Sequence, residues 1–210
     1  SSMRYPLKLT PFSAELAIYI PDYEQVKEVY EAILIDHPAE PFPYWAKLWP
    51  SSIALVQYLK ANAIWIEHKN VLEIGAGLGL PSFMIAGYAN SVQVSDYAPE
   101  AVELLEKNIQ HLQLNNVQAI ELDWNRVPDS IKPDVMLLSD VNYNPSQFDG
   151  LLQLITKLIS EGTIVILSTP QRIMASPFVN AIQPLVKQKH VELVNENGKS
   201  VEISILVLSK

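Results

Sequence analysis

From residue 70 onward, the spacing of apolar positions switches repeatedly between the two-residue period of strands and the longer period of helices. Helical spacing marks residues 81–89, 98–112, 147–159 and 174–186. Strand-like runs alternate with these segments, at residues 70–74, 91–95, 116–122, 134–139 and 163–168. Strands that alternate with helices predict a parallel sheet with helices on both of its faces.

The end of the chain departs from this alternation, because two strand-like runs follow each other at residues 191–194 and 201–208. The segment between them, 195–199, contains two asparagines and a glycine, a composition typical of the turn in an antiparallel hairpin. We therefore predict an α/β fold of the Rossmann-like, doubly wound type. Its sheet would have seven strands and be mostly parallel, and the C-terminal hairpin would contribute an antiparallel strand to it.

Residues 1–50 have a different character, since seven of the 15 prolines of the chain lie there. Helical spacing is confined in this segment to residues 23–35. We interpret residues 1–50 as an N-terminal extension that packs on a single domain formed by residues 51–210.

Composition narrows the classes of protein to which the chain can belong. Of its 210 residues, 49% are hydrophobic and 18% are charged, which indicates a folded globular protein. The absence of cysteine excludes disulfides and thiol catalysis. The four histidines show no spacing typical of metal ligands, so we expect no metal site.

The formal net charge of −8 argues against nucleic-acid binding, which favours a basic face. No apolar run approaches the roughly 18 residues that a membrane helix needs, and no export-signal pattern opens the sequence. We expect a cytoplasmic monomer that contacts neither a membrane nor nucleic acid.

A glycine-rich segment follows the strand-like run at 70–74 and precedes a helix. Gly75, Gly77 and Gly79 let the backbone approach a ligand closely, while free N–H groups of the helix start point outward. The spacing differs from the dinucleotide fingerprint GxGxxG, and Leu80 occupies the place of its small third residue. Glu73 would repel a pyrophosphate but suits a ligand that carries an ammonium group.

Two further acids end the next two predicted strands. Asp96 lies 21 residues after Gly75, where a carboxylate can accept hydrogen bonds from both ribose hydroxyls. Asp123 is followed by Trp124, and this pair could bind the amino group and cover the ring of an adenine. Because ligands bind at the carboxyl ends of such strands, the three acids favour one nucleoside-like ligand.

These residues resemble the motifs of a known family. The segment 71–79, with Glu73 and its three glycines, is similar to motif I of the class I, seven-strand methyltransferases. Residues 44–51, which include Trp49, resemble the stretch before motif I in the branch that contains protein lysine methyltransferases. Asp123 and Trp124 resemble a later motif of that branch, and residues 140–143 resemble its Asp-x-x-Tyr motif. The similarity spans residues 42–168.

The resemblance implies that the protein binds S-adenosyl-L-methionine and methylates a lysine side chain of a protein substrate. The cofactor-binding residues that follow from the motifs and from the strand ends are Trp49, Glu73, Gly75, Ala76, Gly77, Gly79, Asp96, Tyr97, Asp123, Trp124 and Ser139. The same branch implies that Asp140 and Tyr143 are the catalytic residues.

Methyl transfer is an in-line displacement, so the protein mainly positions and desolvates the reactants. A lysine nucleophile must first lose a proton, which costs roughly 4–5 kcal/mol at pH 7. We expect Asp140 to align the amine or to take its proton, and Tyr143 to shape the channel around it.

Several alternatives stay open at this point. Asp140 could instead cap the following helix, and Trp45 and Trp49 could only anchor the N-terminal extension. The protein could methylate a small amine, or it could be a catalytically silent protein that binds the cofactor or a partner. A NAD oxidoreductase would bind NADH rather than S-adenosylmethionine.

Overall fold

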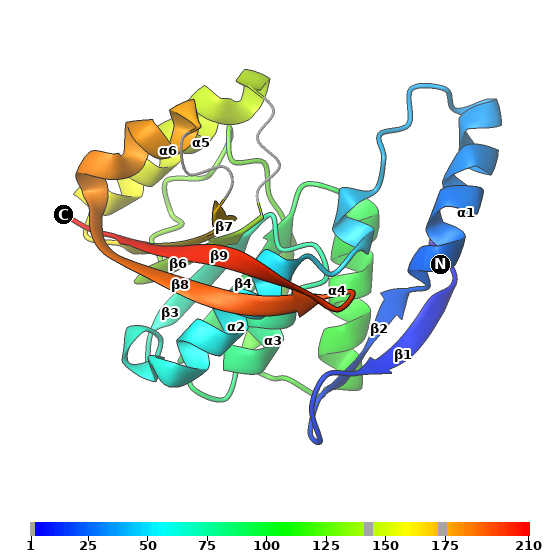
Figure 1. The fold of residues 1–210 in the computed structure, drawn as a ribbon, viewed down its shortest axis with the longest axis horizontal. Coiled ribbons are helices and arrows are strands. Elements are labelled where there is room, and N and C mark those ends of the chain that lie inside the picture. Colours follow the sequence, from blue (N-terminus) through cyan, green and yellow to red (C-terminus); the bar gives the residue numbers. More distant parts are fainter. Residues whose placement is uncertain (1–2, 141–144, 172–175) are drawn as a thin grey trace.

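The computed structural model describes residues 3–140, 145–171 and 176–210 (Figure 1). Its centre is a sheet of seven strands in the order β5-β4-β3-β6-β7-β9-β8. The strands are β3 (Asn70–Ile74), β4 (Ser91–Asp96), β5 (Val117–Glu121), β6 (Val135–Ser139), β7 (Ile164–Pro170), β8 (Val186–Glu196) and β9 (Lys199–Leu208). Strand β9 runs antiparallel to β7 and β8, whereas the pairs among β3 to β7 are parallel. The predicted fold class is confirmed.

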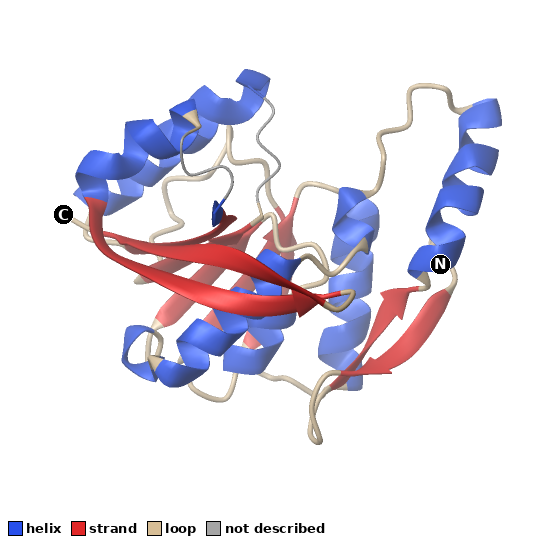
Figure 2. Cartoon of the chain, in the orientation of Figure 1, coloured by secondary structure: helices blue, strands red, loops and turns tan. Residues whose placement is uncertain are grey.

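Helices cover both faces of this sheet (Figure 2). Apolar side chains of α2 (Pro50–Ala61), α3 (Leu80–Ile85) and α4 (Pro99–His111) pack against one face. Side chains of α5 (Pro145–Ser160) and α6 (Pro177–Ile182) pack against the other. The five residues of β6 are all buried, as expected of a central strand between two apolar layers.

The N-terminal segment forms more structure than its sequence predicted. The expected helix is present as α1 (Tyr23–Asp36), but it follows an antiparallel hairpin of β1 (Leu7–Pro11) and β2 (Ala17–Pro21). The hairpin lies beside α4 (Figure 1), where the Asn108 amide accepts from N–H of Tyr19 at 2.8 Å and donates to its carbonyl at 2.9 Å. A domain boundary at residue 50 stays a prediction.

Three predicted elements have different lengths in the structure. Helix α3 ends at Ile85, four residues before the predicted end at residue 89. The predicted helix at 174–186 is also too long, because α6 ends at Ile182 and Pro184 follows in a short 3-10 turn. Strand β8 begins at Val186 rather than near residue 191. After Val186, residues 187–190 are polar and exposed at the sheet edge, so they carry no apolar alternation.

Gly79 connects the glycine-rich loop to α3 at a position where a side chain does not fit. Its φ angle is +75°, and a Cβ atom there would lie 2.5 Å from Cδ2 of Leu105. We expect Gly79→Ala to lower the free energy of unfolding by about 2–4 kcal/mol, through left-handed strain and overpacking. Urea unfolding checks this against Gly87→Ala, whose added Cβ would meet nothing within 4 Å. Equal stabilities of the two variants would contradict the packing described.

Candidate active site

The glycine-rich loop lies at the carboxyl end of β3 and is held from two sides. N–H of Ala76 donates to the carbonyl of Ser95 at 2.8 Å, and N–H of Gly77 donates to Oδ2 of Asp96 at 2.8 Å. On the other side, a Cβ atom on Gly77 would lie 3.2 Å from the backbone oxygen of Trp45. The loop is therefore fixed between the end of β4 and the segment that precedes α2.

Asp96 ends β4 and has little freedom to move. It is 8% exposed, and its Oδ1 accepts from N–H of Ala98 at 3.0 Å while Oδ2 holds Gly77. Burial raises the pKa of this carboxyl, and hydrogen bonds from the backbone of Ala98, Gly77 and Tyr97 oppose the shift. Because a carboxylate oxygen has two lone pairs, each oxygen of Asp96 can accept a further hydrogen bond from a ligand.

Glu73 lies on β3, behind the loop rather than in the wall of the cavity. It is fully buried, and its Oε1 accepts from the hydroxyl of Ser82 at 2.6 Å and from N–H of Ser82 at 3.2 Å. Among the described residues, Oε2 has no hydrogen-bond partner. Burial raises the pKa of Glu73 to about 8, although the bonds from Ser82 oppose this.

The raised pKa of Glu73 predicts that the protein without ligand becomes less stable as the pH rises. Between pH 4.5 and 8 the folded state retains a proton on Glu73 that the unfolded state has lost, so the free energy of unfolding falls with pH. Urea unfolding at pH 6 and 9 should show a decrease larger by about 2–3 kcal/mol in the wild type than in Glu73→Gln. Parallel pH profiles of the two proteins would contradict this account.

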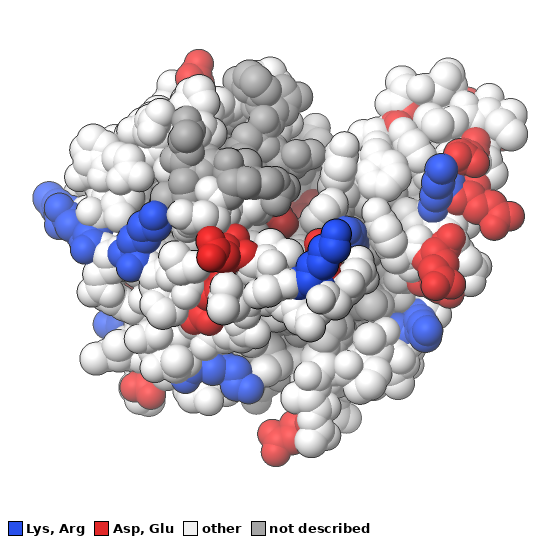
Figure 3. Space-filling model, viewed as in Figure 1, with Lys and Arg blue, Asp and Glu red and all other residues white. Residues whose placement is uncertain are grey.

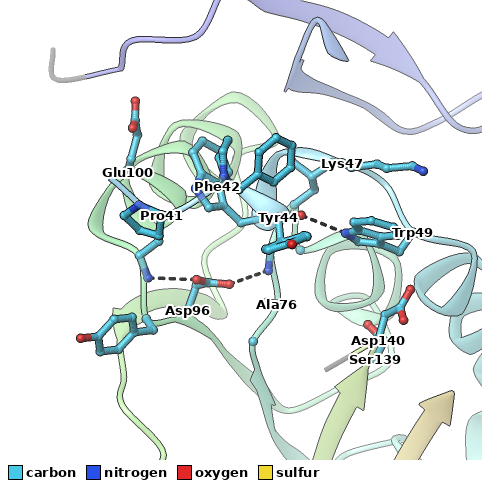
Figure 4. A pocket seen from close by; sticks show the side chains of 18 of the residues that line it. Pro41, Phe42, Tyr44, Lys47, Trp49, Ala76, Asp96, Glu100, Ser139 and Asp140 are labelled. Carbon is cyan, nitrogen blue, oxygen red and sulfur yellow. Dashed lines mark hydrogen bonds between the residues drawn. The ribbon is translucent and has the colours of Figure 1, made fainter. Parts of the chain in front are cut away.

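One cavity of about 660 Å³ opens along the loop and the neighbouring strand ends (Figure 4). The residues predicted at the site that line it are Trp49, Gly75, Ala76, Gly77, Gly79, Asp96, Tyr97, Asp123, Trp124, Ser139 and Asp140. Glu73 is not among the lining residues. Tyr143 lies outside the described residues. The cavity thus brings together positions that are spread over 92 residues of sequence, from Trp49 to Asp140.

Asp123 and Trp124 follow β5 and form one part of this wall. The ring of Trp124 lies over the glycine-rich loop, with Cζ3 at 3.8 Å from the position of a Cβ on Gly75. Oδ1 of Asp123 accepts from N–H of Asn125 at 2.9 Å, which fixes the turn after the strand. A flat ring and a carboxylate are therefore placed next to the loop, as an adenine would need.

Ser139 and Asp140 lie at the carboxyl end of β6, toward the opposite end of the cavity from Asp96 (Figure 4). The hydroxyl of Ser139 is 3.0 Å from that of Ser52 at the start of α2. Asp140 has a φ angle of +47°, a conformation that non-glycine residues rarely adopt and that often marks functional positions. Helix α5 begins only at Pro145, so Asp140 does not directly precede it as a capping residue.

Trp45 and Trp49 have separate roles in the structure. The ring of Trp45 contacts that of Tyr5 edge-on at 5.9 Å and thereby anchors the N-terminal segment. Trp49 lines the cavity, and its Nε1 donates to the carbonyl of Tyr44 at 2.9 Å. Nζ of Lys47 lies 4.5 Å from the centre of the Trp49 ring, a cation–π contact.

A sequence model described as lysine methyltransferase matches residues 44–184, which is more than half of the chain. The chain belongs to this lysine methyltransferase family. The resemblance that the glycine-rich motif and the later motifs indicated is thus confirmed at the level of the family.

The names of the curated relatives specify different methylated residues. Histone-arginine methyltransferase METTL23 of Rattus norvegicus is 36% identical over 116 residues, which cover 52% of this chain and 51% of the relative. Protein N-lysine methyltransferase METTL21A of Danio rerio is 32% identical over 130 residues, 59% of each chain. A histidine protein methyltransferase 1 homolog of Dictyostelium discoideum is 35% identical over 52% of this chain and 38% of its own. The chain spans about half the length of the curated relatives it matches.

Solved structures support the fold assignment. A putative RNA methyltransferase from Pyrococcus horikoshii superposes with a TM-score of 0.60 at 16% identity, over 82% of this chain and 91% of the other. A magnesium protoporphyrin IX methyltransferase from Synechocystis, solved with bound S-adenosylmethionine, gives a TM-score of 0.58 at 18% identity. It covers 76% of this chain and 78% of the other. At these identities the similarity concerns the fold alone.

The sequence did not predict one part of the site, of which Arg4 and Glu40 lie outside the family match. The side chain of Arg4 forms ion pairs with Glu40 and with Glu100, the latter at 2.9 Å, and its backbone N–H donates to Glu100 at 2.7 Å. Both glutamates raise the pKa of Arg4 further, mainly through their hydrogen bonds. All three residues line the cavity, so the N-terminal segment supplies part of its wall.

The described residues contain neither a cluster of metal ligands nor a helix that could span a membrane. In residues 3–140, 145–171 and 176–210, no three His, Asp or Glu side chains gather as metal ligands would. Over the same ranges, no helix has both the length and the apolar character needed to cross a bilayer. On the face drawn in Figure 3, acidic and basic side chains are interspersed, and the surface is hollowed between the N-terminal helix and the body of the domain.

Proposed function

We propose that this protein is an S-adenosylmethionine-dependent methyltransferase that methylates the side-chain amine of a lysine in a protein substrate. The observation that carries this proposal is the single cavity in which the glycine-rich loop and Asp96 lie toward one end and Asp140 toward the other. A nucleoside-binding half and a reacting half are thereby joined without an intervening wall.

The residues fit the cofactor in charge and in hydrogen-bonding capacity. Asp96 keeps free lone pairs for two ribose hydroxyls, and Asp123 with Trp124 offers an acceptor and a ring face for an adenine. Glu73, which the sequence also assigned to the cofactor, does not line the cavity, and it contributes by holding the start of α3 through Ser82. When bound, S-adenosylmethionine supplies a methyl group already activated on a sulfonium. Asp140 would align the attacking amine and take up its proton as the cavity excludes water.

The relatives differ in the residue that they are named for. The family description and METTL21A name lysine, METTL23 names arginine, and a third relative names histidine, so lysine is proposed on the family description. A protein substrate is common to these relatives. A monomeric state and a cytoplasmic location stay predictions from sequence, while transfer to a small amine and cofactor binding without catalysis are the alternatives to this proposal.

Radiolabelled methyl transfer into a protein extract tests the proposal. The protein is incubated with S-adenosylmethionine labelled on its methyl group, and labelled products are separated by size and then hydrolysed. We expect a discrete protein band that yields methyl-lysine. Methyl-arginine or methyl-histidine would change the acceptor, and label confined to small molecules or absent altogether would overturn the proposal.

A further inference from the structure

A second, smaller cavity lies on the far side of Asp140 from the glycine-rich loop. Its volume is about 70 Å³, and it shares Trp49 and Asp140 with the larger cavity. Its remaining wall includes Pro170 of β7 and three residues of the C-terminal hairpin, Glu196, Val201 and Ile203. Trp49 and Asp140 thus lie between the hairpin and the larger cavity, and both contribute to the wall of each cavity.

The chemistry of this wall fits a narrow side chain with an apolar stem and a cationic head. Val201, Ile203 and Pro170 offer apolar contacts for methylene groups, and Trp49 adds a ring that already has Nζ of Lys47 over one face. Asp140 and Glu196 are carboxylates, and no described residue forms an ion pair with Glu196. The volume is about half that of an engineered cavity that admits benzene, so it suits a chain better than a ring.

Glu196 is held in place by the turn of the hairpin. It pairs with Lys199 as the last residue of β8, directly before a tight turn in which Asn197 and Gly198 both have positive φ angles. Oδ1 of Asn195 accepts from N–H of Gly198 at 3.0 Å and closes this turn. A carboxylate on such a defined strand end is positioned before the acceptor arrives, which lowers the entropy lost on binding.

We propose that the small cavity receives the acceptor side chain and that Glu196 binds its cationic group on the way to Asp140. This inference rests on the proposed methyl transfer and adds where the acceptor enters and why it is cationic. The C-terminal hairpin, which the fold uses as a sheet edge, thereby becomes the element that recognises the substrate.

The charge of Glu196 is tested with Glu196→Gln against Glu202→Gln. Glu202 is exposed and lies between Val201 and Ile203, so its side chain points to the other face of β9. The substrate is the protein in extract whose band the wild type labels. Because this acceptor is dilute, the rate of labelling is proportional to kcat/KM. We expect Glu196→Gln to lower this rate about tenfold, and Glu196→Asp to restore most of it. Glu202→Gln should match the wild type, and all variants should bind S-adenosylhomocysteine equally.

The space itself is tested with Val201→Phe, which fills the small cavity, against Glu202→Phe on the opposite face. We expect Val201→Phe to lower labelling more than tenfold with unchanged affinity for S-adenosylhomocysteine, and Glu202→Phe to have no effect. If Glu196→Gln and Val201→Phe both label the protein band at the wild-type rate, the acceptor enters elsewhere and the inference is wrong. The proposed methyltransferase function would not be affected by that result. If the wild type labels nothing, the proposed function itself fails.

Discussion

Replacing Asp140 with asparagine should lower the rate of methyl transfer at least about 100-fold and leave the cofactor affinity unchanged. A loss of about 100-fold is the smallest expected when a general base is removed. Asparagine keeps the shape of the side chain but cannot take a proton from the acceptor. It also tolerates the φ angle of +47° at this position, which alanine does not. The variant therefore separates the chemistry of the carboxylate from the conformation of the backbone.

Two measurements check this expectation on the same protein preparation. Labelled methyl transfer into extract gives the rate, and calorimetric titration with S-adenosylhomocysteine gives the cofactor affinity. Affinities within about twofold of the wild type would show that the cofactor end of the cavity is intact. An unchanged rate would remove Asp140 from the mechanism, whatever its conformation.

Replacing Asp96 with alanine should weaken binding of S-adenosylhomocysteine by about 2–4 kcal/mol, which is about 30- to 1000-fold. The variant loses two charge-assisted hydrogen bonds to the ribose hydroxyls. It also loses the acceptor that holds N–H of Gly77 at 2.8 Å, so the loop is less well fixed before the ligand binds. Calorimetric titration measures the change directly.

Glu121→Ala is the matched control for this variant. Glu121 ends the neighbouring strand β5 and pairs with Asp96 in the sheet, but it is exposed and does not line the cavity. Its removal changes the net charge as much as that of Asp96 and should leave the affinity within about twofold. A similar loss in both variants would mean that the general field of the strand ends, rather than ribose binding by Asp96, attracts the ligand.

The sheet and the cofactor half of the site could be predicted because both depend on local sequence. Each buried strand has its own apolar run, and each acid lies within two residues of a strand end, as Asp96 does at the end of β4. The carboxyl ends of parallel strands meet at one edge of a sheet, so local positions determine their neighbours. The glycine-rich loop needs positive φ angles at Gly75, Gly77 and Gly79, which makes its conformation visible in the sequence.

The parts that could not be predicted depend on contacts between distant residues. Arg4 and Glu100 are separated by 96 residues, and a single charged side chain gives no sign of its partner. The hairpin of β1 and β2 is stabilised by Asn108 of α4, which its own sequence does not encode. The contacts of Glu73 with α3 also join distant residues, since its Oε1 accepts from N–H of Ser82, while its Oε2 has no partner among the described residues.

The common fold does not determine which residue of a substrate is methylated. Relatives whose names specify lysine, arginine and histidine methylation each match 52–59% of the chain. Function therefore depends on residues grafted onto a common sheet rather than on the sheet itself. In this protein the hairpin residues around Glu196 are the place where such a choice would be made.

Calorimetric titration of the protein with S-adenosylhomocysteine, with NADH titrated in parallel, tests the central claim most directly. The cavity with Asp96 at one end and Asp140 at the other predicts saturable binding of one S-adenosylhomocysteine per chain and no binding of NADH. Absence of S-adenosylhomocysteine binding, or binding of NADH in its place, would contradict the assignment of the cavity.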